Sequence, residues 1–489
     1  MTIAGKTILT LSLGSVLSLI AAPVLAQSAQ TAPSKPAPAK PAPAKPAASA
    51  TAPESILPVP AASASATPAA SPSPAASPSP GATPAATATA TIPAVEPIDE
   101  PVMKWTAADA QALLTVIKGI GSDGLIPADY EPDKLATAIL AGEGEALDKQ
   151  ASRSFSWLVE DMRDGRTRMA SRVQWFVVDK DIEQSPVTAI MALALETHDI
   201  AGAIQSLAPS APDYARLKAL LAKTPKADTR ARDQIRINLD RWRWLPRDLG
   251  PLHLMTNVPE FQLRVVKNDE VILTYKTVVG KPGKTATPQL AEHITAVVFN
   301  PTWTVPQSIV MGEGLGPQLL ANPARAAREG YKVTKAENGW ISVVQQPGDN
   351  NALGRMKIDM PNEHAIYLHD TPSKQFFKHP VRAYSHGCIR TERAVELGMA
   401  LAMKGAGWTN QQATDTFLSK QYTKVPLTTP FPVYLTYFTV GTDISGKMGK
   451  YPDIYGRDAP VLAAFNAPRK PWDGISKTSE KVIKLDNPI

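Results

Sequence analysis

The chain has a single cysteine, Cys388, and histidines are concentrated close to it. Four of the seven histidines fall between His364 and His386, and the cysteine lies in the string SHGCIR, from Ser385 to Arg390. A cysteine thiol is mostly protonated at neutral pH, so a nucleophilic cysteine needs a base, a cation or a helix N-terminus nearby. Histidine supplies such a base, and the grouping therefore predicts acyl transfer through a covalent thioester.

The neighbouring residues suggest roles in that chemistry. His369 ends a predicted strand at 365–368 and is the expected proton acceptor. Cys388 precedes a helical pattern that begins near Thr391, so the positive end of a helix is expected to favour its thiolate. The backbone N–H groups of Gly387 and Cys388 are the expected oxyanion donors, because glycine lets a carbonyl group approach closely.

Other functions of the thiol have to be weighed against this one. A lone cysteine can be a small buried hydrophobic residue, and His369, His386 and Cys388 could also bind zinc. A fourth ligand and paired ligand spacing are missing from the sequence, so no metal or cofactor is expected. A papain-like peptidase is disfavoured because its cysteine precedes its histidine. A binding protein without enzymatic activity stays open.

The residues before this site are expected to form helices. Thr106 followed by Asp109 is typical of a helix N-terminus, and apolar residues then recur at helical spacing. Further helical patterns cover 155–162, 187–195, 214–221 and 232–244.

Beyond Pro246 the pattern changes to the alternation of strands, which predicts an α+β protein. Glycines and prolines interrupt the segment 306–362, and such an insertion is expected to be a lid or binding loop. A helical pattern at 391–404 follows the cysteine. The predicted strands lie at 252–254, 261–265, 271–275, 293–299, 365–368 and 425–440.

The N-terminal residues indicate export. Residues 1–26 combine Lys6, an apolar stretch and small residues at a cleavage site, as a secretory signal does; an uncleaved anchor is the alternative. Residues 27–98 are rich in Ala, Pro, Ser and Thr and are expected to be a disordered spacer. The net charge of +6 is dispersed, which argues against a nucleic-acid surface and fits an acidic polymer.

The residues Ser385–Arg390, with fifteen residues between His369 and Ser385, resemble the signature of L,D-transpeptidases with a YkuD-type catalytic domain. Four longer strings are similar to the large periplasmic YcbB-like subgroup: NPTWTVPQSI from Asn300, QPGDNNALGRMKIDMPN from Gln346, YLHDTPSK from Tyr367 and DIYGRD from Asp453.

The resemblance implies a periplasmic enzyme that acts on peptidoglycan stem peptides, as donor and acceptor, and is inhibited by carbapenems. Such enzymes attack the bond between meso-diaminopimelate and the fourth-position D-alanine. They pass the acyl group to the side-chain amine of another diaminopimelate, which gives a 3-3 cross-link. Water in place of the amine would make the protein an L,D-carboxypeptidase or endopeptidase. Cell-wall synthesis proteins are further candidate partners; the oligomeric state is not predicted.

Carried onto this sequence, the resemblance assigns Cys388 as nucleophile and His369 as base. It also implies a mixed β-rich catalytic domain with a capping insertion, behind an α-helical scaffold domain. The expected pocket residues are Ser385, His386, Gly387, Arg390 and Asp370, with Trp303, Tyr367 and Tyr384 as weaker candidates. The expected boundaries are 1–26 for the signal, 27–98 for the spacer, 99–245 for the scaffold, 246–465 for the catalytic domain with its cap at 306–362, and 466–489 for a tail. The stretch 214–232 is too short for the peptidoglycan-binding module that the subgroup often carries.

Overall fold

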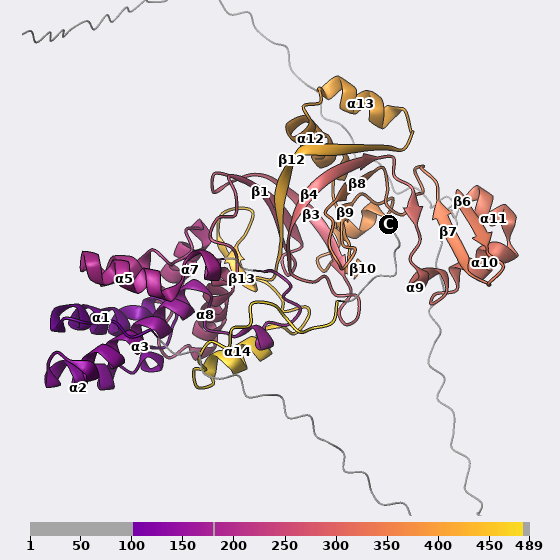
Figure 1. Ribbon diagram of the computed structural model, residues 1–489. Coiled ribbons are helices and arrows are strands. Elements are labelled where there is room, and N and C mark those ends of the chain that lie inside the picture. Colours follow the sequence, from indigo (N-terminus) through magenta and orange to yellow (C-terminus); the bar gives the residue numbers. More distant parts are fainter. Residues whose placement is uncertain (1–100, 179–180, 483–489) are drawn as a thin grey trace, which may run out of the picture. The chain divides into compact units, whose positions relative to one another are not determined.

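The computed structural model describes residues 101–178 and 181–482 (Figure 1). The expected signal and the whole of the expected spacer lie outside these residues. Among the described helices, none combines the length and the apolar character needed to cross a bilayer.

The first part of the described chain is helical, as its periodicity predicted. The hydroxyl of Thr106 accepts a hydrogen bond from the Asp109 N–H and so satisfies a free donor in the first turn of α1. The helices are α1 (Ala107–Gly119), α2 (Pro132–Ala141), α3 (Glu145–Arg163), α4 (Asp181–Gln184), α5 (Val187–Thr197), α6 (Ile200–Gln205), α7 (Pro212–Lys223) and α8 (Thr229–Arg243). Short 3₁₀ turns lie at Ile120–Asp123, Pro127–Tyr130 and Met169–Ser171. Apolar residues of α1, α2, α3, α5 and α6 share one core, whereas those of α7 and α8 pack with residues of the following β-rich part.

The β-rich part is built on a nine-stranded sheet that closes on itself. Its strands are β1 (Leu252–Asn257), β2 (Gln262–Lys267), β3 (Glu270–Gly280), β4 (Leu290–Phe299), β8 (Met356–Asp359), β9 (Leu368–His369), β10 (Ala383–Ser385), β11 (Ile389–Thr391) and β12 (Thr423–Thr436). Their order is β10-β3-β11-β9-β8-β4-β12-β1-β2, and β2 also pairs with β3. Strand β3 closes the ring because residues 270–276 pair with β2 while residues 277–280 pair with β11 and β10.

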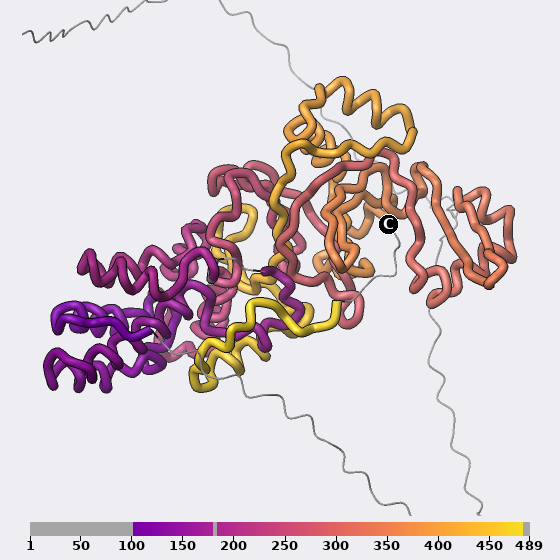
Figure 2. Tube along the Cα trace, in the orientation of Figure 1, coloured from indigo at the N-terminus to yellow at the C-terminus, as the bar shows by residue number. Residues whose placement is uncertain are grey.

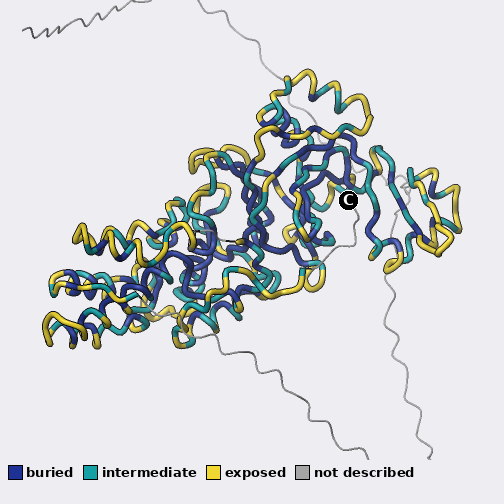
Figure 3. Tube along the Cα trace, viewed as in Figure 1, coloured by how far each residue is buried: buried dark blue, intermediate teal, exposed yellow. Residues whose placement is uncertain are grey.

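The main hydrophobic core of the β-rich part lies between this sheet and two helices, α12 (Ala394–Ala406) and α13 (Asn410–Leu418). Helix α12 packs over β4, β8 and β12, and Figure 3 shows the buried residues concentrated along the strands. The helix expected from Thr391 starts three residues later, at Ala394. Residues 389–391 instead form β11, because their backbone groups pair with β9 and β3.

Residues 303–345 form a small unit with a core of its own, which we call the cap. Its elements are β5 (Trp303–Thr304), α9 (Gln307–Val310), α10 (Leu315–Ala321), α11 (Pro323–Arg328), β6 (Tyr331–Lys335) and β7 (Ile341–Gln345). Its buried apolar residues are Val305, Val310, Leu319, Ala326, Ile341 and Val343. The glycine-rich segment is therefore folded, and the end of the expected range contributes β8 to the main sheet.

The chain then returns to the helical region. It forms β13 (Val440–Thr442), β14 (Met448–Lys450) and α14 (Asp458–Asn466), and α14 packs against α8 (Figure 2). The Arg166 guanidinium donates hydrogen bonds to the carbonyl groups of Ala464 and Ala467. Arg469 forms ion pairs with Glu160 and Asp161, at 2.5 and 3.0 Å. The described part of the expected tail is thus bonded to α3.

Replacing Asp161 by Asn is expected to destabilise the protein. Asp161 is fully buried and pairs with Arg168 and Arg469. Removing one partner of a buried ion pair costs about 3–5 kcal/mol. Burial alone would raise the pKa of Asp161, but Arg469 and Arg168 lower it below its ordinary value of 3.8. The stabilisation is therefore present above pH 3.8 and is lost as the pH falls further.

Urea unfolding at neutral and at acid pH measures this effect. The free energy of unfolding of Asp161→Asn should be lower than that of the wild type at pH 7, and the difference should shrink below the ordinary carboxyl pKa. If the free energies of unfolding of the variant and the wild type differed equally at both pH values, the charge of Asp161 would not be the source of the stabilisation.

Candidate active site

Cys388 and His369 lie at the ends of two adjacent parallel strands. In β9 and β11, Leu368 is paired with Ile389 and His369 with Arg390. Leu368 and Ile389 are fully buried in the core of the sheet. Because side chains alternate along a strand, Cys388, Arg390 and His369 share the opposite face. The fold thus brings together two residues that are nineteen positions apart in the sequence.

Tyr367 lies on the same face and contacts the nucleophile. Its ring centroid is 5.6 Å from that of His369. Its hydroxyl is within hydrogen-bonding reach of the Cys388 thiol and of the Trp303 indole. The ammonium group of Lys357, on the neighbouring strand β8, lies 4.5 Å from the centre of the Tyr367 ring. Lys357 was not predicted as a site residue, although its alternation with buried Met356 and Ile358 would have placed it on this face.

The His369 imidazole is held as a neutral base. Its Nδ1 lies 2.5 Å from the backbone carbonyl oxygen of Asp370. A carbonyl oxygen can only accept, so Nδ1 carries the proton and Nε2 keeps a free lone pair. Burial, followed by the positive charges of Arg390 and Lys357, lowers the pKa of His369 to about 3. The imidazole is therefore unprotonated throughout the neutral pH range.

The Asp370 side chain fixes the backbone that orients this histidine. Its carboxylate accepts a hydrogen bond from the Arg355 N–H at 3.0 Å and forms an ion pair with Lys374. Gly354 has φ +62°, and a Cβ there would lie 2.4 Å from the carboxylate. Only glycine suits both this backbone conformation and this close approach. Asp370 therefore acts on His369 through the main chain.

The Cys388 thiol is partly buried and protonated in the resting state. Burial raises its pKa to about 11, although hydrogen bonds from Tyr367 and the charge of Lys357 act in the opposite direction. Its Sγ lies 3.7 Å from the carbonyl oxygen of Ala365. The expected thiolate at a helix N-terminus is wrong, because α12 begins only at Ala394 and a helix dipole acts within about one turn.

The turn before the nucleophile is held by two hydroxyl groups. The Ser385 hydroxyl accepts from the Gly387 N–H at 3.1 Å and donates to the Cys388 carbonyl at 2.6 Å. The Thr287 hydroxyl donates to the Gly387 carbonyl at 2.8 Å. The Gly387 N–H is therefore engaged and does not serve as a free oxyanion donor here. Within residues 101–178 and 181–482, the Cys388 N–H makes no backbone hydrogen bond that would compete for this role.

Arg390 presents a charge without an acidic partner. Its guanidinium lies 5.7 Å from the centre of the Phe376 ring, and its Nε is buried without a hydrogen-bond partner. None of the ion pairs among the described residues includes it. A partly buried cation without a counter-ion has lost part of its hydration, so an anionic substrate group would find a favourable partner here.

The remaining predicted residues lie around this centre. Trp303 begins the cap at β5. The Tyr384 hydroxyl lies 2.9 Å from Nδ1 of His379, at hydrogen-bonding distance. His386 points to the cap, where its Nε2 lies 2.8 Å from a carboxylate oxygen of Glu313. In the part of the chain that the structure describes, no three His, Cys, Asp or Glu side chains are grouped as metal ligands.

Two family patterns match the described chain. Residues 251–400 match the YkuD family, the L,D-transpeptidase catalytic domain, and residues 102–221 match the Scaffold domain. A protein of Haemophilus influenzae named "Putative L,D-transpeptidase" is 31% identical over 304 residues, which are 58% of this chain and 60% of that protein. The chain thus spans three fifths of the length of this relative.

Solved structures of L,D-transpeptidases are also similar in part. An enzyme from Mycobacterium smegmatis is 14% identical over 38% of this chain and 58% of that chain, with a TM-score of 0.20. L,D-transpeptidase 1 from Mycobacterium tuberculosis is 13% identical over 38% of this chain and 61% of that chain, with a TM-score of 0.17. Scores this low support no structural argument. The family patterns confirm the resemblance read from the motif: residues 251–400 belong to the YkuD family of L,D-transpeptidase catalytic domains, joined in one chain to a scaffold domain at residues 102–221.

Proposed function

We propose that this protein is a periplasmic peptidoglycan L,D-transpeptidase that acts through a cysteine acyl-enzyme. The observation that carries the proposal is the placement of Cys388 and the neutral His369 on one face of adjacent strands in a YkuD domain. The donor would be a tetrapeptide stem. The products would be D-alanine and a cross-link between third-position residues.

In acylation, Nε2 of His369 takes the thiol proton as Sγ of Cys388 attacks the diaminopimelate carbonyl carbon. The proton moves during the attack, because the thiol pKa of about 11 leaves little free thiolate at neutral pH. The negative charge that develops on the carbonyl oxygen would be stabilised by the Cys388 N–H. The C–N bond then breaks, and His369 returns the proton to the leaving D-alanine amine.

In the second half-reaction, the side-chain amine of another diaminopimelate attacks the thioester. His369 accepts a proton from this amine, the C–S bond breaks, and the proton returns to the Cys388 sulfur. Water in place of the amine would give hydrolysis. The contact of Glu313 with His386 supports a role for the cap in covering this site and limiting the access of water.

The charges of the site suit an acidic donor. Stem peptides carry carboxylates, and Arg390 offers a partly buried guanidinium without an ion pair among the described residues. Lys357 adds a second cation beside Tyr367, although it also pairs with Asp359 at 2.8 Å. We infer that Arg390 binds a carboxylate of the donor stem close to the scissile bond.

Incubation of the purified protein with tetrapeptide muropeptides tests this function. Mass spectrometry should detect released D-alanine and a dimer whose fragments place the bond between two diaminopimelate residues. Tripeptide without dimer would show instead an L,D-carboxypeptidase that hydrolyses the same acyl-enzyme. If neither product forms, while the protein is folded by circular dichroism, the proposed activity is wrong.

A further inference from the structure

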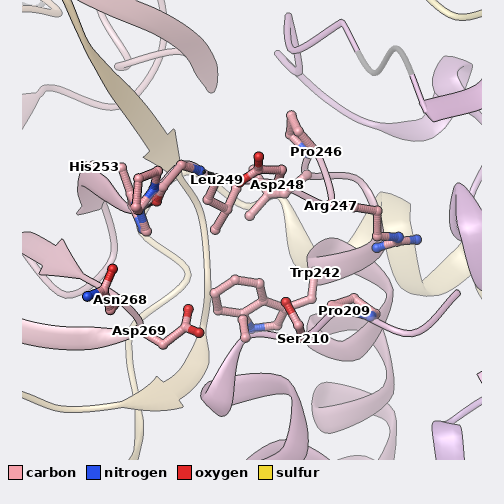
Figure 4. Close-up of a pocket in the computed structure, with 14 residues that line it drawn as sticks. Pro209, Ser210, Trp242, Pro246, Arg247, Asp248, Leu249, His253, Asn268 and Asp269 are labelled. Carbon is pink, nitrogen blue, oxygen red and sulfur yellow. Dashed lines mark hydrogen bonds between the residues drawn. The ribbon is translucent and has the colours of Figure 1, made fainter. Parts of the chain in front are cut away.

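Two adjoining cavities, which share five lining residues, lie where the scaffold meets the sheet and do not include the predicted catalytic residues; Figure 4 shows the first of them. Their volumes are about 370 and 460 Å³, within the range of small-molecule sites. Both are lined by Trp242 of α8, His253 of β1 and Asp269 of the turn between β2 and β3. Neither is lined by Cys388 or His369.

Trp242 gives these cavities a rigid aromatic wall. Its ring stacks on Phe438 with a centroid distance of 4.7 Å and an interplanar angle of 22°. In Figure 4 its indole lies beside the Asp269 carboxylate, with Leu249 and Asp248 drawn above it. A fixed aromatic surface loses little conformational entropy when a flat apolar group packs on it.

His253 supplies a hydrogen-bond acceptor to both cavities. The residue is only 4% exposed, and its Nδ1 lies 2.9 Å from the Gly250 carbonyl oxygen, so Nδ1 carries the proton. Nε2 is left as an acceptor, and its ring makes no other hydrogen bond among the described residues. Burial lowers the pKa of His253, which keeps this acceptor neutral. An acceptor of this kind is suited to a hydroxyl or amide N–H of a ligand.

Carboxylates outnumber cations at both cavities, which disfavours an anion: Arg247 lines the first beside two carboxylates, and Arg216 and Arg264 line the second beside four. Asp248 and Asp269 form no ion pair within the described residues, and Asp248 accepts a single hydrogen bond, from the Gly250 N–H at 2.8 Å. Carboxylates without counter-ions repel the acidic stem peptide that Arg390 would attract. They accept hydrogen bonds from sugar hydroxyls, while the apolar face of a sugar ring packs on an indole. The two sites therefore suit different parts of one polymer.

We propose that the cavities lined by Trp242, His253, Asp248 and Asp269 bind a neutral N-acetylated amino sugar of a glycan strand. This inference deepens the proposed function and rests on it for the identity of the polymer. The site would hold the glycan while the stem peptide enters the catalytic face. It would provide wall attachment without the binding module that the stretch 214–232 is too short to hold.

The test is a calorimetric titration of the wild-type protein with tri-N-acetylchitotriose, repeated with the double variant Asp248→Asn/Asp269→Asn. Asparagine keeps the hydrogen bond to the Gly250 N–H and tolerates the positive φ of 64° at position 269. Loss of both charges weakens the hydrogen bonds that the two side chains accept, so binding should weaken by about tenfold or more. The matched control, Glu337→Gln/Asp415→Asn, removes two exposed charges and should bind as the wild type does.

Carbapenem labelling of Cys388 separates this inference from the proposed function. A wild-type protein that is labelled but does not bind the sugar would overturn the glycan site and leave the function intact. Equal binding by the double variant and the wild type would overturn the placement of the site. Trilysine that binds in preference to the sugar, and loses affinity in the double variant, would show a cation site instead.

Discussion

A carbapenem is expected to add its mass once to the intact protein and not at all to the Cys388→Ala variant. The chain has one thiol, so no other cysteine can form the thioester. Transpeptidation should fall to the background level in the same variant, because the acyl-enzyme cannot form. Intact-mass spectrometry after a short incubation, with product analysis alongside, measures both effects.

The control for this experiment is the stability of the variant. Cys388 is partly buried, so its replacement by alanine should lower the thermal midpoint only slightly. Ser385→Ala is a useful comparison, since it removes the hydroxyl that holds the turn and leaves the thiol in place. That variant should be labelled more slowly but still completely. An adduct on Cys388→Ala would show that another group is the nucleophile.

Replacing His369 by Ala should slow acylation by about 10²–10⁴-fold, the usual contribution of a general base. The alkylation of Cys388 by iodoacetamide should keep its pH dependence, because a neutral imidazole has no charge that could shift the thiol pKa of about 11. His386→Ala should change the acylation rate much less, since that ring contacts Glu313 of the cap. Stopped-flow acylation and alkylation at several pH values separate these outcomes.

The pH dependence of the wild-type acylation rate tests independently whether His369 is neutral. With a His369 pKa of about 3, acylation should show no loss of rate near the ordinary histidine value of 6.5. A rate that falls with a midpoint near 6.5 would contradict a buried neutral base. Stability follows the same titration: the unfolded chain binds the proton at higher pH than the native state, so the native state loses stability as the pH falls from 6.5 towards 3.

The sequence was sufficient to predict the class of fold, the helical region and the family, because these depend on long periodic segments and on a specific motif. The expectation that a helix N-terminus favours the Cys388 thiolate was wrong. The helical pattern near Thr391 is local, whereas residues 389–391 pair with strands that lie more than a hundred and about twenty positions away. Such non-local pairing is not visible in periodicity, and it removes Cys388 from the helix N-terminus.

The cap and the two cavities are features that could not be predicted from the sequence, for two different reasons. Helices α9, α10 and α11 have four, seven and six residues, too short for a helical period to be recognised. Their glycines and prolines were therefore interpreted as an irregular insertion. The cavities combine Trp242 with the turn at Asp269, and neither residue belongs to a motif. They come together only in the folded chain, where Trp242 of α8 and Met255 of β1 share one core and Trp242 and Asp269 line the same cavities.

The return of the C-terminal segment to α3 has a consequence for the order in which the protein is made. Asp161 leaves the ribosome about three hundred residues before its partner Arg469. Until then α3 carries a buried carboxylate that lacks one of its two cations, and Glu160 beside it lacks its nearer cation. The helical region thus cannot reach its final stability during synthesis, and a nascent chain that is still incomplete stays easier to unfold than the finished protein.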